Sequence, residues 1–126
     1  MNTILAIAAG GALGAVSRYG FNTGALKIFG DGFPFGTLGV NVLGSFLMGI
    51  AIAGFAHFWQ PPQELRLFLI TGFLGAFTTF SAFSLDVSTL FERGELSQVA
   101  LYISASVVFS IAALFVGMAI MRVIAA

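Results

Sequence analysis

Charged residues cut this sequence into four long apolar stretches joined by short connections, and no other feature constrains its fold as strongly. The helices that these stretches predict cover roughly residues 3–28, 34–58, 64–91 and 96–123. Each supplies the roughly 20 residues with which a helix crosses a hydrocarbon core of about 30 Å. Because a helix satisfies its own backbone hydrogen bonds in lipid, we expect an all-α membrane protein. The chain, residues 1–126, then forms one integral-membrane domain.

The composition excludes the main alternatives to a membrane protein. Apolar residues make up 59% of the chain and charged residues 8%, against roughly 25% charged residues in an ordinary globular domain. A water-soluble domain of this size cannot hide so much apolar surface, and disordered chains have the opposite composition. The chain contains no cysteine and has as many basic as acidic residues. Neither a cysteine metal site nor a nucleic-acid partner is therefore expected.

The third stretch contains residues that weaken a helix in the middle of the membrane. Gly72, Gly75 and the pair Thr78–Thr79 lie within one apolar run. Irregular backbone at this depth is tolerated only inside protein or beside a cavity. We therefore predict a broken third helix, whose freed carbonyl groups can coordinate a cation and whose freed N–H groups can meet an anion.

Small residues recur at four-residue spacing on three of the predicted helices, a pattern typical of close helix packing in lipid. The pairs include Gly10/Gly14, Gly20/Gly24, Ser45/Gly49 and Gly72/Ala76. We expect them to bring helix backbones together.

The positive charges leave the orientation of the chain in the membrane undecided. Four helices put both termini on one side, together with Arg66 and Arg122, and put Lys27 and Arg93 on the other side. Since the more positive side normally stays in the cytoplasm, this balance gives no preference. Either a partner or the insertion machinery decides the orientation, or the chain inserts both ways and forms an antiparallel dual-topology homodimer.

Two stripes of polar side chains run along otherwise apolar helices, because residues four apart share one helix face. The first stripe consists of Thr37, Asn41 and Ser45. The second stripe, on the fourth helix, consists of Tyr102, Ser106 and Ser110. The Asn41 amide offers N–H donors without a charge, which suits a dehydrated anion. The first stripe also fits a hydrogen bond between helices through Asn41. The second stripe also fits hydroxyl groups that bond back to their own helix.

Two aromatic residues and one arginine complete the candidate functional residues. Phe80 and Phe83 are about one turn apart, and the positive edges of their rings attract a small anion weakly. The same residues also fit ordinary packing or contact with lipid. Arg18 is the one ionisable residue deep within a predicted span. It either draws an anion into a vestibule or holds helix ends.

Three sequence motifs, in this order, resemble those of a known family. They are GGALGAVSRY at residues 10–19, GTLGVN at residues 36–41 and GFLGAFTTFS at residues 72–81. In these motifs, in length and in layout, the chain is similar to the Fluc (CrcB) fluoride channels. The resemblance implies a small four-helix membrane protein that assembles as an antiparallel dual-topology homodimer.

The resemblance also implies roles for individual residues. Two fluoride pores run through the dimer, and their lining comprises Asn41, Phe80, Phe83, Ser81, Thr79, Ser110, Thr37 and Tyr102. Arg18 corresponds to an arginine near a vestibule connected to the cytoplasm. The backbone carbonyl groups of Gly75 and Thr78 hold a structural sodium ion (Na+), and no organic cofactor is implied. The family often has threonine where this chain has Ala82, which removes one hydroxyl from the polar track.

The implied function is a fluoride-selective channel in the bacterial plasma (inner) membrane, through which cytoplasmic fluoride leaves passively. An enzyme is not expected, because no acid–base or nucleophile constellation is buried. One alternative is a small multidrug-type proton antiporter, which needs a glutamate in the first helix, whereas residues 4–26 contain no acid. Asp86 and the other carboxylates fall at or near predicted span ends, which disfavours a proton-coupled pump. The other alternative is a membrane scaffold without transport.

Overall fold

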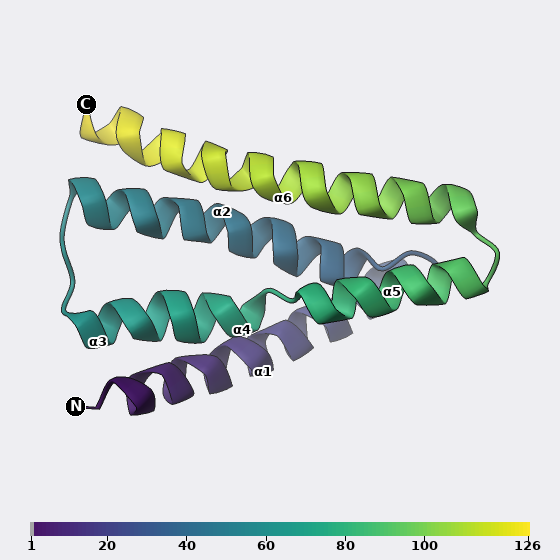
Figure 1. Cartoon of the computed structure of the whole chain (residues 1–126), viewed down its shortest axis with the longest axis horizontal. Helices are drawn as coiled ribbons and strands as arrows, with labels where there is room; N and C mark the ends of the chain where they lie inside the picture. Colours follow the sequence, from purple (N-terminus) through teal and green to yellow (C-terminus); the bar gives the residue numbers. More distant parts are fainter. Residues whose placement is uncertain (1) are drawn as a thin grey trace.

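Four helical segments run side by side in the computed structural model, which describes residues 2–126 (Figure 1). In chain order the elements are α1 (Thr3–Phe29), α2 (Phe35–His57), α3 (Gln63–Arg66), the π-helix η1 (Leu67–Leu74), α4 (Gly75–Phe77), α5 (Phe80–Glu92) and α6 (Leu96–Ala125). The elements from α3 to α5 form the third segment. Each of the four segments is long and apolar enough to cross a membrane, so the prediction of an all-helical chain with four spans is confirmed.

Short connections join the segments and put both termini at the same end of the bundle (Figure 1). At the start of α1, the Asn2 side chain accepts a hydrogen bond of 2.7 Å from the Ile4 N–H and acts as an N-cap. At its end, Gly30 has φ +73°, a left-handed conformation, and its N–H donates to the Leu26 carbonyl. The 27-residue helix between these caps exceeds the length that a span requires.

Glycine residues bring α1 into direct backbone contact with η1. A Cβ atom at Gly10 would collide with the backbone carbonyl of Phe68, and one at Gly14 with that of Phe73. Only hydrogen atoms fit at these two positions, so the helix axes lie closer together than larger side chains would permit. The close packing predicted for the Gly10/Gly14 pair is confirmed.

A second contact of this kind joins α2 to α6, where a Cβ atom at Gly49 would collide with the backbone carbonyl of Leu114. Gly20 and Gly24 behave differently, because a Cβ atom at either position would have no neighbour within 4 Å. The prediction of close packing is therefore wrong for the Gly20/Gly24 pair within a single chain. Spacing alone does not distinguish a glycine that faces another helix from one that faces outward.

The third segment changes its backbone geometry twice before it continues as α5. η1 is a π-helix, a widened form that is rare and frequently lies at functional sites. After the three residues of α4, Thr78 and Thr79 are extended, with ψ angles of 157° and 120°. We call these two residues the interruption. It is visible between α4 and α5 in Figure 1.

α6 turns polar residues inward and large apolar residues outward, the reverse of a helix on a water-soluble protein. Its buried residues are Tyr102, Ser106 and Gly117. Outward side chains such as Phe109 and Phe115 are 57% and 61% exposed. Apolar surface of this extent is stable in contact with lipid, whereas in water it would cause association.

Replacing Gly49 by alanine tests the contact between α2 and α6. The added methyl group would collide with the Leu114 backbone, so we expect Gly49→Ala to lower the free energy of unfolding by about 1–3 kcal/mol. Gly54→Ala is the matched control, because its methyl group meets only the flexible end of Met121 in the same interface. Unfolding in detergent micelles measures both variants. Equal stability of the two would contradict the backbone contact.

Candidate functional site

The interruption removes helical hydrogen bonds in the middle of the third segment. In a continuous helix, the Gly75 carbonyl accepts from the Thr79 N–H, and the Thr78 carbonyl accepts from the Ala82 N–H. Here the Thr79 N–H donates to the Asn41 side chain, and the Ala82 N–H donates to the Thr79 hydroxyl. The carbonyl groups of Gly75 and Thr78 are thereby released from the helix.

Asn41 on α2 holds the interruption with both ends of its amide group. Its Nδ2 donates to the Thr79 carbonyl over 3.0 Å, and its Oδ1 accepts from the Thr79 N–H over 2.7 Å. A side-chain amide has two N–H donors, so one remains for another partner after these bonds. Besides the predicted role as a donor to an anion, Asn41 therefore fixes the backbone from which α5 starts.

The Thr79 side chain caps α5. Its hydroxyl accepts from the Ala82 N–H over 3.1 Å, as an N-cap residue does, and lies 3.2 Å from the Ser81 hydroxyl. The N–H groups in the first turn of a helix have no partner within that helix. This end of α5 therefore offers N–H donors and the positive end of the helix dipole in the middle of the third segment.

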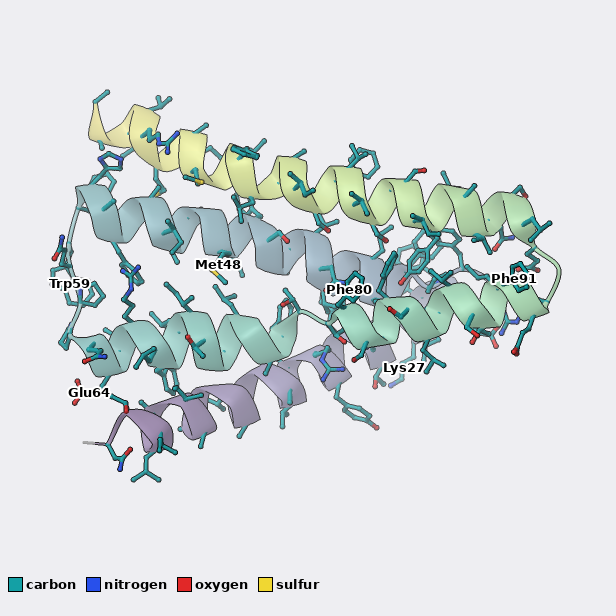
Figure 2. The ribbon with its side chains drawn as sticks, in the orientation of Figure 1. Lys27, Met48, Trp59, Glu64, Phe80 and Phe91 are labelled. Carbon is teal, nitrogen blue, oxygen red and sulfur yellow. The ribbon has the colours of Figure 1, made fainter. Side chains whose placement is uncertain are left out.

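A groove with a volume of about 310 Å³ lies beside the interruption, between α2, α5 and α6. Its lining consists of Asn41, Ser45, Thr78, Thr79, Phe80, Phe83, Ser106, Val107, Ser110 and Ile111. None of these residues is charged. Figure 2 shows Phe80 at the start of α5, directly after the interruption. The sequence predicts five of these residues as pore residues on three separate helices, and the structure brings them together. They are Asn41, Thr79, Phe80, Phe83 and Ser110.

Two serine hydroxyls on α6 give the groove unused hydrogen-bonding capacity. The Oγ atoms of Ser106 and Ser110 are buried and have no hydrogen-bond partner among the described residues. A buried hydroxyl without a partner costs on the order of 1–3 kcal/mol, and folded proteins contain few of them. Ser106 and Ser110 are therefore able to donate to a ligand that enters the groove.

The aromatic rings form a series that starts at the groove. The Phe80 side chain is 78% exposed, and its ring centroid lies 5.4 Å from that of Phe83. The Phe83 ring in turn lies 5.2 Å from the ring of Tyr102, at an interplanar angle of 43°. Neither pair is stacked face to face, so ring edges as well as ring faces are presented along this series.

Three further predicted residues lie near the groove without lining it. The Tyr102 hydroxyl donates to Asp86 over 2.9 Å. Thr37 and Asp86 both line a second cavity of about 390 Å³. Ser81 is exposed, and its hydroxyl lies within hydrogen-bonding distance of the Thr79 hydroxyl. Asp86 is the middle residue of α5 rather than an end residue.

The bond between Asp86 and Tyr102 was not predicted from the sequence. The sequence contains one indication of it, because Asp86 follows Phe83 by one helical turn and so shares its helix face.

Arg18 lines neither the groove nor the second cavity. Its Nε–H donates to the Ala76 carbonyl over 3.0 Å, and this bond is partly buried. The bond ties α1 to the end of α4. The vestibule role of Arg18 stays a prediction.

A cation at the interruption would depend on backbone oxygens. The described residues contain no group of three or more histidine, cysteine, aspartate or glutamate side chains that could hold a metal ion. The carbonyl groups of Gly75 and Thr78, released from the helix, are oxygen ligands of the kind that binds sodium at unwound helices. Gly75 is also an exposed residue in the single chain.

Four spans and an uncharged polar groove beside an extended stretch of backbone define a small multi-pass membrane protein of the channel and transporter class. Comparison with known families supports this class of protein. The model of the family described as "CrcB-like protein, Camphor Resistance (CrcB)" matches residues 5–118, and the chain belongs to this family.

Curated relatives cover almost the whole chain and carry the name "Fluoride-specific ion channel FluC". The protein of Rhodospirillum centenum is 52% identical over 97% of both chains. That of Rhizobium etli is 54% identical over 94% of both chains, and that of Nitrobacter winogradskyi is 53% identical over 96% of both. With its four spans, the chain is a multi-pass protein of the bacterial plasma membrane, and its family is one of transport proteins rather than enzymes.

Substitution of Asn41 by leucine tests the amide contact with the interruption. Asn41→Leu keeps a side chain of similar size but leaves the Thr79 N–H and carbonyl without their partner. We expect a loss of about 1–3 kcal/mol in the free energy of unfolding. Thr23→Val is the control, because the Thr23 hydroxyl bonds only to the Tyr19 carbonyl of its own helix. If both variants unfold alike in detergent, Asn41 does not hold the interruption.

Proposed function

We propose that this chain is a fluoride-selective channel through which cytoplasmic fluoride leaves the cell passively. The observation that carries the proposal is the uncharged groove in which Asn41, Phe80 and Phe83 meet two serine hydroxyls without partners. The name of the curated relatives supports fluoride as the ion.

The groove has the donors that a small, strongly hydrated anion requires. Fluoride enters a narrow pore only where other hydrogen-bond donors replace its water. The free N–H of Asn41, the hydroxyls of Ser106 and Ser110 and the N-terminal turn of α5 supply such donors. The edges of the phenylalanine rings add weak attraction. Because no lining residue carries a full charge, the anion is held loosely enough to leave, as conduction requires.

A second, inverted copy would close the open side of the groove. Phe80 is 78% exposed in one chain, and polar backbone in mid-membrane has to be covered by protein or water. Arg66 ends α3 and Arg122 lies in the last turn of α6, at the end of the bundle that holds the termini, whereas Lys27 lies in the last turn of α1 and Arg93 follows α5, toward the opposite end (Figure 1). This balance permits insertion in both orientations. Two chains in opposite orientations then form a homodimer with two pores, each lined by both copies.

The same dimer would hold a central structural sodium ion. Each chain contributes the carbonyl groups of Gly75 and Thr78, and two carbonyl groups are too few for the coordination of a hard cation by oxygen. The exposure of Gly75 supports a site shared with a second chain. When bound, the ion offsets the partial negative charge of these carbonyl groups and links the two copies.

The physiological role follows from the acid–base chemistry of fluoride. Hydrogen fluoride crosses membranes as a neutral molecule and dissociates in a less acidic cytoplasm, where the anion is trapped. A passive fluoride pore in the plasma membrane releases this anion along its electrochemical gradient. The negative potential inside the cell assists its exit.

Efflux from liposomes tests the proposed function. The purified protein is reconstituted into vesicles loaded with fluoride or chloride, and ion-selective electrodes follow the release of each anion. Rapid efflux of fluoride without chloride is the expected result, because the larger anion does not fit among the same donors. Absence of fluoride efflux from folded protein would overturn the channel proposal.

Exchange of one phenylalanine tests the role of the ring edges. Phe80→Ile removes the ring beside the interruption, and we expect fluoride flux to fall by about tenfold or more, equivalent to about 1.4 kcal/mol at the barrier. Phe91→Ile is the matched control, since Phe91 is 63% exposed on the same helix and lies near its other end (Figure 2). Size-exclusion chromatography checks that both variants assemble. Normal flux in Phe80→Ile would exclude the ring-edge role.

Replacement of sodium by potassium tests the cation site. A ligand that binds only the folded assembly stabilises it in proportion to the logarithm of its concentration. We therefore expect the midpoint of thermal unfolding to rise with sodium concentration at constant ionic strength, with potassium making up the remainder. An unfolding midpoint that is the same in both salts would contradict a sodium site.

A further inference from the structure

Arg18 makes one side-chain hydrogen bond, and this bond goes to the backbone of the third segment. It lies in the second half of α1, within a segment that is long and apolar enough to cross the membrane. Its Nε–H donates to the backbone carbonyl of Ala76, 58 residues further along the chain, over 3.0 Å. The residue lines neither the groove nor the second cavity. Its Nε–H is therefore used on the backbone rather than on the groove.

The carbonyl that Arg18 reaches is one that the interruption has released. In a continuous helix, the Ala76 carbonyl would accept from the Phe80 N–H. The extended backbone of Thr78 and Thr79 separates these two residues, and α4 ends at Phe77. Ala76 lies at the C-terminal end of α4, where a positive side chain is favourable because of the helix dipole. The hydrogen bond from Arg18 thus replaces the lost N–H partner of the Ala76 carbonyl. It also places a positive side chain near the negative end of the helix dipole.

We infer that Arg18 is a positioning residue, which fixes the geometry of the interruption by holding the Ala76 carbonyl. Asn41 holds the interruption from the α2 side through Thr79, and Arg18 holds it from the α1 side. Arg18 occupies the Ala76 carbonyl, and the carbonyl groups of Gly75 and Thr78 are among those that stay free beside it. Its effect on transport rests on the proposed function, whereas its effect on the backbone does not.

The atom that makes the bond distinguishes this role from simple attraction of anions. Attraction requires the positive charge, whereas positioning requires a donor at the place of Nε. Glutamine has three carbons before its Nε2, as arginine has before its Nε, so Arg18→Gln keeps the donor and removes the charge. Lysine has a methylene group at that place, so Arg18→Lys keeps the charge and displaces the donor. Arg18→Met removes both.

Hydrogen–deuterium exchange with mass spectrometry reads the geometry of the interruption directly. The informative amides are those of Thr78, Thr79 and Ala82, whose hydrogen bonds depend on that geometry. We expect exchange in Arg18→Gln to match the natural chain. In Arg18→Lys and Arg18→Met we expect roughly tenfold faster exchange, the ratio that one hydrogen bond of ordinary net strength maintains. Lys27→Gln is the control, because it removes a positive charge from the same helix away from the interruption.

The same preparations are reconstituted for fluoride efflux. The positioning role predicts that Arg18→Gln conducts better than Arg18→Lys, and attraction of anions predicts the reverse order. Protection of the amides by lysine but not by glutamine would overturn the inference, as would uniform exchange in all variants. If the natural chain does not conduct while the exchange order holds, the proposed function fails and the positioning role stands. The comparison of glutamine with lysine decides the question even if Arg18→Met does not fold.

Discussion

A polar backbone cannot remain unsatisfied in the middle of a membrane, and the arrangement of this molecule depends on how that constraint is met at Thr78 and Thr79. The two extended residues release carbonyl groups from α4 and N–H groups at the start of α5. Side chains from two other helices supply hydrogen-bond partners for some of these groups. Asn41 bonds to both backbone groups of Thr79, and Arg18 bonds to the Ala76 carbonyl. The carbonyl groups of Gly75 and Thr78 and the hydroxyls of Ser106 and Ser110 remain without such a partner.

The distribution of polar groups follows from the same constraint. α6 presents Tyr102 and Ser106 to the protein and apolar side chains to the outside. α2 contributes Asn41 and Ser45 to the same groove. An uncharged groove of this kind provides many weak partners instead of one strong one, which is what a conducting pore requires. In a single chain the groove is open on one side. This open side is the reason for proposing a second copy.

The sequence predicts the four spans because charged residues mark their ends, and it predicts close packing at Gly10/Gly14 because spacing on a helix defines a face. It does not predict which face meets which neighbour, so Gly20/Gly24 is misassigned. The partners of Arg18 and Asn41 are backbone atoms of Ala76 and Thr79, and backbone acceptors leave no trace in a pattern of side chains. The bond between Tyr102 and Asp86 depends on how α5 restarts after the interruption. The roles of the groove residues in fluoride transport stay predictions.

The central claim is that an inverted second copy completes the groove, and the orientation of the chain tests it most directly. The chain contains no cysteine, and Gln60 is an exposed, uncharged residue in the connection between α2 and α3. A cysteine at this position can be labelled in intact cells with a maleimide that does not cross membranes, followed by labelling after permeabilisation. About half of the copies should react from outside the cell if both orientations insert equally. Labelling of all copies, or of none, would show a single orientation and contradict the inverted dimer.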